Sequence, residues 1–359
     1  MAASVARYFR AAEGSNGAAN PTNGPGNPVE MMAVQQPQTE LAVRMSAKDN
    51  SDAVATRGGG APDVHVGVQT SIGRRATNED RHAVQQQDGT AGAPLWLSEA
   101  TFVGVYDGHG GAQCAQYCKE ELHAALARET GDRPTAGELR EGLARAFGKT
   151  DSAFLDMAEG SNCRAGTTAV VAVVTDSALA VAHVGDSRAL AVYADTTAEF
   201  LTIDHKPSRP DEQRRIESAG GEVVKRQPVW RVSTKGASDW QTRCRTGRVA
   251  FNEQPPVLLA VSRAFGNKDL KRPKEIVTAV PETKVWALDA LEKPSFVVLC
   301  TDGVWDVLSA ERVAEHCLRA MEIAGGPCAS AAKDAAATIV ADAESNGSMD
   351  NCTAAVCIL

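Results

Sequence analysis

Residues 102–111 read FVGVYDGHGG, an apolar run that stops at an aspartate followed by a glycine-rich turn. Valine and aromatic residues favour a strand, and Asp-Gly after such a run is most often a turn. Similar junctions are GDSR at 185–188, after LAVAHV, and DGVWD at 302–306, after FVVLCT. Acidic residues also flank β-rich runs at Asn78–Asp80 and Asp350–Asn351. One such motif is ordinary, but their recurrence predicts strand ends that gather several carboxylates in one crevice.

Gathered carboxylates favour a particular class of ligand. They repel one another unless cations neutralise them. Hard divalent ions prefer oxygen ligands, and Mg²⁺ keeps several waters while taking only a few carboxylates. A glycine beside an aspartate lets a backbone carbonyl approach a metal, because glycine has no Cβ. Histidines and cysteines at zinc spacing do not occur in the sequence, so the pattern predicts a hard-ion site.

Composition places the chain among soluble globular proteins. It has 359 residues, of which 43% are hydrophobic and 23% charged, with a net charge of −8. The negative charge disfavours nucleic-acid binding, and without an apolar run of about 18 residues no membrane span is expected. The nine cysteines, without a CxxC pair, indicate reduced thiols in an intracellular protein. Cys114 and Cys118 leave a soft-metal site open, but Leu122 and Leu126 continue their helical stripe and favour core packing.

The N-terminal segment differs from the rest of the chain. Residues 1–61 are rich in Ala, Gly, Asn, Pro and Gln, which predicts a disordered low-complexity tail before a domain at 62–359. Arg7 and Arg10 precede the first acid, which leaves an organellar transit peptide open; otherwise a cytoplasmic or nuclear location is expected.

The domain alternates valine- and alanine-rich runs with helical stretches. Strands are predicted at 101–106, 167–174, 179–184, 189–192, 296–300 and 353–359. Helices are predicted at 111–126, 210–219, 310–324 and 329–343, with Ser309 and Gly325 as caps of the third. Clustered strands and grouped helices favour packed antiparallel sheets flanked by helices over a regular βαβ repeat. His183 and Trp305 are interpreted as core residues, and His205 as a loop residue.

The motifs, taken in order, resemble the PPM family of metal-dependent protein phosphatases, the 2C type. They run over about 63–359 as GRRATNEDR (73–81), FVGVYDGHGG (102–111), AGTTAV (165–170), VGDSRA (184–189), DHKP (204–207), LAVSRAFGN (259–267), CTDGVWDVL (300–308) and MDNCTA (349–354). The resemblance implies an α+β fold, an α/β/β/α sandwich of two antiparallel sheets with a dinuclear metal site at one edge. It also implies hydrolysis of phosphoserine and phosphothreonine by direct attack of a metal-bridging hydroxide.

The resemblance also assigns metal ligands, for two Mn²⁺ or Mg²⁺ ions per subunit and a weaker third. Asp107 matches the bridging aspartate, and Asp302 and Asp350 match further ligands of one ion. The other ion is expected at Glu79 and the carbonyl of Gly108. The third site is matched by Asp186 with Asp302 and Asp306, while Asp80 matches a supporting acid.

Catalytic roles follow from the same resemblance. Arg75 matches the arginine that binds the phosphate, and its two-pronged guanidinium suits a tetrahedral oxyanion. His109 matches the residue proposed to protonate the leaving oxygen. The family usually has Asp where this chain has Asn267, which affects local loop contacts or an extra ion rather than a core ligand.

Phosphoproteins are the expected partners of a monomeric enzyme, without nucleic acid or membrane. A catalytically inactive binding protein of this fold would normally lack a metal ligand, and a different phosphohydrolase would need another motif such as DxDx[TV]. About 224–256 is expected to form a variable flap, in which residues 225–248 carry seven basic residues against the single acid Asp239. Either this is a solvated loop, or it gathers substrates with acidic flanks.

Overall fold

The computed structural model describes residues 64–85, 100–131, 134–248, 255–288 and 294–359. The predicted tail at 1–61, the domain start at 62 and residues 249–254 of the predicted flap lie outside these ranges. Within them, no helix combines the length and apolar character that crossing a membrane requires.

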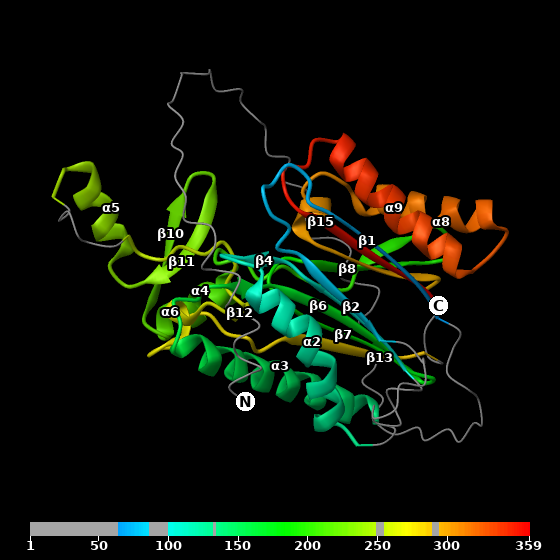
Figure 1. The fold of residues 1–359 in the computed structure, drawn as a ribbon, viewed down its shortest axis with the longest axis horizontal. Coiled ribbons are helices and arrows are strands. Elements are labelled where there is room, and N and C mark those ends of the chain that lie inside the picture. Colours follow the sequence, from blue (N-terminus) through cyan, green and yellow to red (C-terminus); the bar gives the residue numbers. More distant parts are fainter. Residues whose placement is uncertain (1–63, 86–99, 132–133, 249–254, 289–293) are drawn as a thin grey trace. The chain divides into compact units, whose positions relative to one another are not determined.

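Two five-stranded antiparallel sheets form the centre of the domain (Figure 1). The first sheet has the order β1-β15-β14-β8-β9, with strands His65–Ser71, Cys352–Ile358, Phe296–Cys300, Arg188–Val192 and Ala198–Phe200. The second has the order β13-β7-β6-β3-β2, with strands Glu282–Ala287, Ala178–Val184, Ala169–Val174, Thr101–Tyr106 and Arg81–Gln85. The predicted strands are found within a few residues of their predicted bounds, except that the run predicted at 167–174 is divided, and only β6 of it belongs to these sheets.

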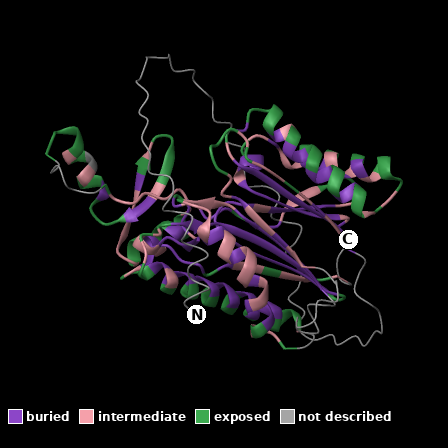
Figure 2. Ribbon diagram, viewed as in Figure 1, coloured by how far each residue is buried: buried purple, intermediate pink, exposed green. Residues whose placement is uncertain are grey.

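The period of two along β3 explains how the layers pack. Phe102 and Tyr106 point to the helices that cover the second sheet, where they join one buried cluster. Val103 and Val105, on the opposite face, join Val297 and residues of both sheets in a second cluster. Alternate side chains face opposite sides of a strand, so β3 contacts a different layer on each face. All of its residues are buried. Figure 2 shows the same burial across both sheets.

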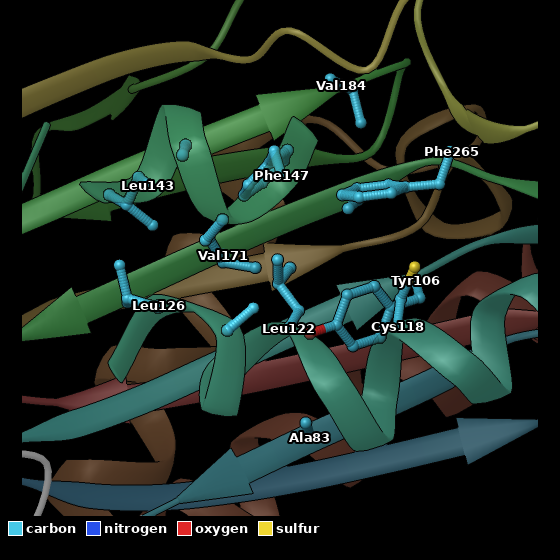
Figure 3. Close-up of a cluster of buried hydrophobic side chains, with 14 of the residues drawn as sticks. Ala83, Tyr106, Cys118, Leu122, Leu126, Leu143, Phe147, Val171, Val184 and Phe265 are labelled. Atoms are coloured by element: carbon cyan, nitrogen blue, oxygen red, sulfur yellow. The ribbon is translucent and has the colours of Figure 1, made fainter. Parts of the chain in front are cut away.

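Two pairs of helices cover the outer faces of the sheets (Figure 1). On the second sheet, α2 (Gln113–Glu129) and α3 (Ala136–Glu159) present Leu122, Leu126, Leu143 and Phe147 to Tyr106 and its neighbours, as Figure 3 shows. On the first sheet, α8 (Ala310–Ala324) and α9 (Ala329–Ser345) contribute Val313 and Ile339 to a third cluster. The predicted α/β/β/α sandwich is therefore confirmed, although α3 was not among the predicted helices.

Smaller elements complete the described part of the domain. A three-stranded sheet has the order β12-β5-β4, with strands Phe265–Gly266, Gly166–Thr167 and Gly108–His109. The predicted flap contains the hairpin β10–β11 and helix α5, at Gly221–Arg226, Val229–Thr234 and Ala237–Arg245. Three further helices are α4 (Pro210–Ser218), α6 (Lys268–Lys271) and α7 (Asp302–Trp305).

The cysteines behave as the sequence indicates. All nine are free thiols, and Cys114 and Cys118 lie on the buried face of α2. Tyr106, Leu122 and Leu126 belong to the same cluster, so the apolar interpretation of this helical stripe is confirmed.

Candidate metal centre

Three aspartates meet where the strands of both sheets end. Asp107 follows β3 and Asp186 follows β7, both in the second sheet, while Asp302 follows β14 in the first. One carboxylate oxygen from each lies within 4.8 Å of the others. The fold therefore brings together residues that are 79 and 116 positions apart in the sequence (186 − 107 and 302 − 186).

Mutual repulsion and burial disfavour negative charge at this cluster. Burial raises the pKa of Asp107 well above its usual value, and the charges of Asp302 and Asp80 add to the effect. Burial, with Asp186 and Asp306 nearby, raises the pKa of Asp302 to about 8. A bound cation would reverse this effect, because an opposite charge favours the ionised carboxylate.

Asp80 lies next to the cluster and connects the two sheets through hydrogen bonds. It accepts hydrogen bonds from the hydroxyls of Thr353, at 2.7 Å, and Thr301, at 3.1 Å. Burial nevertheless raises the pKa of Asp80 to about 6. Thr301 precedes Asp302, so the contact fixes the start of α7 against the second sheet.

Glu79 and Gly108 lie against each other. A Cβ on Gly108 would come within 2.4 Å of the carbonyl oxygen of Glu79, so only glycine fits here. The Glu79 carboxylate accepts a hydrogen bond from the Gly111 backbone amide at 3.1 Å. The backbone amide of Glu79 donates to Asn351 Oδ1 at 2.9 Å. Asn351 also donates to the carbonyls of Ile72 and Thr77, so its amide joins the Glu79 loop to Asp350. Sequence reasoning did not assign Asn351 this role.

Arg75 and Asp350 form an ion pair at the rim. Arg75 Nη2 lies 2.5 Å from Asp350 Oδ2, and Nε donates to the Met349 carbonyl at 3.3 Å. The arginine side chain is 57% exposed, so its guanidinium is reachable from solvent beside the acidic cluster.

Lys206 is a residue of the site that sequence reasoning missed. Its ammonium forms an ion pair with Asp186, which is buried. Asp306, whose pKa is raised by burial, interacts electrostatically with both Lys206 and Asp186. Lys206 belongs to the DHKP motif, and that motif was the only sequence signal for it.

His109 lies on β4, beside the carboxylates. Its Nε2 is 3.0 Å from Oδ1 of Asn267, the position at which the chain departs from the usual family pattern. Burial lowers the pKa of His109, and the hydrogen bond with Asn267 offsets part of this decrease.

A second group, His183, His205 and Glu282, also places possible ligand atoms within 4.8 Å of one another. Most of the polar atoms in this group already have protein partners. His183 Nε2 donates to the Ile203 carbonyl at 2.9 Å, His205 Nδ1 accepts from the Gly185 amide at 3.1 Å, and Arg209 pairs with Glu282. His205 Nε2 lies 3.5 Å from Glu282 Oε1. We interpret the group as structural. The core role of His183 and the loop position of His205 are confirmed, although His205 is buried.

Hard divalent ions fit the aspartate cluster. Its three converging atoms are carboxylate oxygens, the donors that Mg²⁺ and Mn²⁺ prefer over sulfur or imidazole. Trp305, between Asp302 and Asp306, packs in the core and donates Nε1–H to the Cys300 carbonyl at 2.9 Å. This contact fixes the short helix α7, which begins at Asp302 and is followed directly by Asp306.

Comparison with known proteins supports the same conclusion. The family model described as Protein phosphatase 2C matches residues 64–352. The chain is 34% identical over 314 residues to Probable protein phosphatase 2C 59 of Arabidopsis thaliana, covering 87% of this chain and 86% of that protein. It is 36% identical over 245 residues to Probable protein phosphatase 2C 14 of the same plant, covering 68% and 46% respectively.

A solved structure is similar as well. The serine-threonine phosphatase 2C from Toxoplasma gondii matches with a TM-score of 0.66 and 28% identity, covering 84% of this chain and 96% of that chain. The family match spans most of the chain, including the acidic cluster and the strands of both sheets except β15, of which it reaches only the first residue. The chain therefore belongs to the protein phosphatase 2C family, as a metal-dependent protein serine/threonine phosphatase.

Proposed function

We propose that this phosphatase passes the phosphoryl group of phosphoserine and phosphothreonine directly to a water-derived nucleophile, without a phospho-enzyme. The observation that carries the proposal is the convergence of the Asp107, Asp186 and Asp302 carboxylates within 4.8 Å. Two Mn²⁺ or Mg²⁺ ions bound there would supply Lewis-acid charge and lower the pKa of a water to near neutrality.

The residues around the cluster have separate tasks in this proposal. Asp107, Asp302, Asp350, Glu79 and the Gly108 carbonyl would hold the two ions, and Asp186 with Asp302 and Asp306 would hold a weaker third ion. Arg75 binds the equatorial oxygens of the phosphate, where charge accumulates during transfer. His109 donates a proton to the departing serine or threonine oxygen.

A catalytically inactive binding protein is the main alternative. Such a protein would normally have lost an ion ligand, whereas Glu79, Asp107, Asp302 and Asp350 are all present. We therefore favour an active enzyme, and we propose that it acts on phosphoprotein substrates as a monomer.

Metal removal and a single substitution test the proposal together. Turnover of a phosphoserine peptide should stop in chelator and return with Mn²⁺ or Mg²⁺. Asp107→Asn should lower turnover by at least about 100-fold, because Lewis-acid stabilisation is worth several kcal/mol. Asp176→Asn is a matched control, since Asp176 is exposed and precedes the opposite end of β7 from Asp186. Full activity in chelator would contradict the proposed metal role.

The direct-attack step needs its own measurement. Acid quenching of a turnover with ³²P-labelled substrate should trap no labelled protein. Label trapped on an aspartate would show that the reaction passes through a covalent intermediate and would contradict direct attack.

A further inference from the structure

The three-stranded sheet β12-β5-β4 places Asn267 opposite His109. Gly166, on the central strand β5, pairs with His109 on one side and with Gly266 on the other. Asn267 directly follows Gly266, so this register brings its side chain across the small sheet to the imidazole. Nε2 of His109 lies 3.0 Å from Oδ1 of Asn267.

The carboxamide of Asn267 fills a fitted slot. Asn267 is buried, with 6% of its surface exposed. A Cβ on Gly166 would lie 2.2 Å from Asn267 Oδ1, so the glycine makes room for this contact. Asn267 has a left-handed backbone, with φ of 56°, a conformation that asparagine tolerates better than most residues.

The loop around Asn267 is held independently of His109. The Asn267 amide donates to the Ala165 carbonyl at 3.0 Å. The Gly266 amide donates to Asp151 of α3 at 2.7 Å, and Lys271 pairs with the same carboxylate at 2.6 Å. Asp151 and Lys271 are both buried. The amide oxygen is therefore presented by a fixed support, as a positioning group requires.

We propose that Asn267 is a positioning residue that orients His109 for proton transfer to the leaving group. A carboxamide oxygen only accepts hydrogen bonds, so Nε2–H of His109 is the donor in their contact. Nδ1 makes no hydrogen bond to any other residue in the described part of the chain and is the nitrogen that serves the substrate. The inference rests on the proposed acid role of His109.

The step balances as follows. The nucleophilic oxygen forms a bond to phosphorus as the bond from phosphorus to the seryl oxygen breaks. The seryl oxygen takes the electron pair of that bond and the proton on His109 Nδ1, leaving a neutral imidazole with its proton on Nε2. Solvent then returns a proton to Nδ1. Asn267 keeps its contact with Nε2–H throughout, so the ring stays in register for the next turnover.

The left-handed backbone of Asn267 dictates the test variants. Asn267→Gly removes the amide while accepting the observed φ, whereas alanine would add backbone strain. We expect kcat for a phosphoserine peptide to fall about 10-fold with KM unchanged, as a fraction of the 10²–10⁴-fold worth of a general acid. Turnover of p-nitrophenyl phosphate, whose leaving group needs no proton, should change less than about 2-fold. Asn267→Asp keeps a hydrogen-bond acceptor at this position, so its peptide turnover should stay close to that of the parent, unlike that of Asn267→Gly.

Two further variants separate the possible failures. His109→Ala should lower peptide turnover far more than p-nitrophenyl phosphate turnover; equal losses would remove the acid role and this inference with it. If His109→Ala is selective but Asn267→Gly lowers both substrates equally, or neither, the positioning role alone is wrong. Thr196→Gly is the control for a glycine at a left-handed position, since Thr196 has φ of 72° and lies in the turn between β8 and β9. Melting temperatures of all variants report whether they fold.

Discussion

Asp80 depends on two hydroxyls from the opposite sheet, those of Thr301 and Thr353. Partners behind metal ligands typically change metal affinity by about 10–100-fold when removed. Thr353→Val deletes one of these hydrogen bonds, together with the 2.9 Å contact between the Thr353 and Thr70 hydroxyls, without changing the side-chain shape. We expect the Mn²⁺ concentration for half-maximal activity to rise about 10-fold, measured by titrating metal into chelator-treated enzyme.

Thr150 provides the control for that substitution. It is also buried, but its hydroxyl has no hydrogen-bond partner among the described residues. Thr150→Val should therefore leave the metal requirement unchanged and be neutral or stabilising, since an unpartnered polar group is costly to bury. Equal metal requirements in the two variants would show that the Asp80 hydrogen bond is dispensable.

His183 predicts a pH dependence of stability. Burial, with the nearby charge of His205, lowers its pKa from 6.5 to about 4. The unfolded chain therefore binds a proton between pH 6.5 and 4 that the folded protein does not, and stability falls as the pH drops through this window. Between pH 7 and 5 this residue alone should lower the free energy of unfolding by about 2 kcal/mol.

Urea unfolding of the parent and of His183→Gln at the two pH values measures this difference. The glutamine keeps a donor for the Ile203 carbonyl but does not titrate. Its stability should vary less with pH, and the remaining slope reports groups such as His205, whose pKa burial also lowers. An identical slope in both proteins would contradict the assignment.

Sequence reasoning identified the acidic residues of the site but few of the residues that support them. Asp107, Asp186 and Asp302 stand beside glycine at strand ends, which is a local signal. Lys206 and Thr301 support the site through contacts with residues of other elements, and no spacing along the chain reveals those contacts.

The flap elements carry a local excess of positive charge in a chain whose net charge is −8. Asp239 pairs with Arg243 at 3.0 Å, and Lys225 lies over the exposed ring of Trp230. Within the described residues, no carboxylate pairs with Arg231, Lys235 or Arg245; the complete basic set is Lys225, Arg226, Arg231, Lys235, Arg243, Arg245 and Arg248. Val232 bridges to Leu259, the first residue of the segment that leads to Asn267.

This basic surface predicts a preference for phosphopeptides with acidic flanks. The triple variant Arg231→Glu, Lys235→Glu, Arg245→Glu should lower kcat/KM for an acidic phosphopeptide about 10-fold at low salt. Opposite charge mainly speeds encounter, and salt screens it over about 8–10 Å, so the loss should shrink at higher ionic strength. Turnover of p-nitrophenyl phosphate should not change.

A charge-matched control uses exposed residues on the outer helices. Arg140, Arg319 and Lys333 lie on α3, α8 and α9, and the same three reversals there should leave peptide preference intact. If both triple variants lose activity equally, net charge rather than the flap is responsible.

Elements differ in how readily the sequence predicts them. Helix α8 has the predicted bounds because Ser309 accepts from the Arg312 amide and Gly325 adopts a left-handed C-cap. Helix α3 carries a capping box at Thr135 and Glu138, but Gly142 and Gly148 interrupt its pattern, and it was missed. The strands β4, β5 and β12 have two residues each, too few to show any periodicity.

At the scale of the whole molecule, the N-terminal segment is predicted to be dispensable for the fold. Its composition offers little apolar surface to offset the entropy of ordering. A protein that begins at residue 62 should keep its melting temperature within a few degrees and its peptide turnover within about 2-fold. A large drop in either would show that residues 1–61 pack on the domain.

The metal centre draws its aspartates from the ends of strands in both sheets. Ion binding therefore depends on how the two sheets pack, because neither sheet alone presents all three carboxylates. A compact acid state that kept its strands while loosening the packing between layers would retain far-ultraviolet dichroism and lose tight ion uptake. Conversely, ions that bind only when the two sheets are packed together would stabilise the sandwich by mass action.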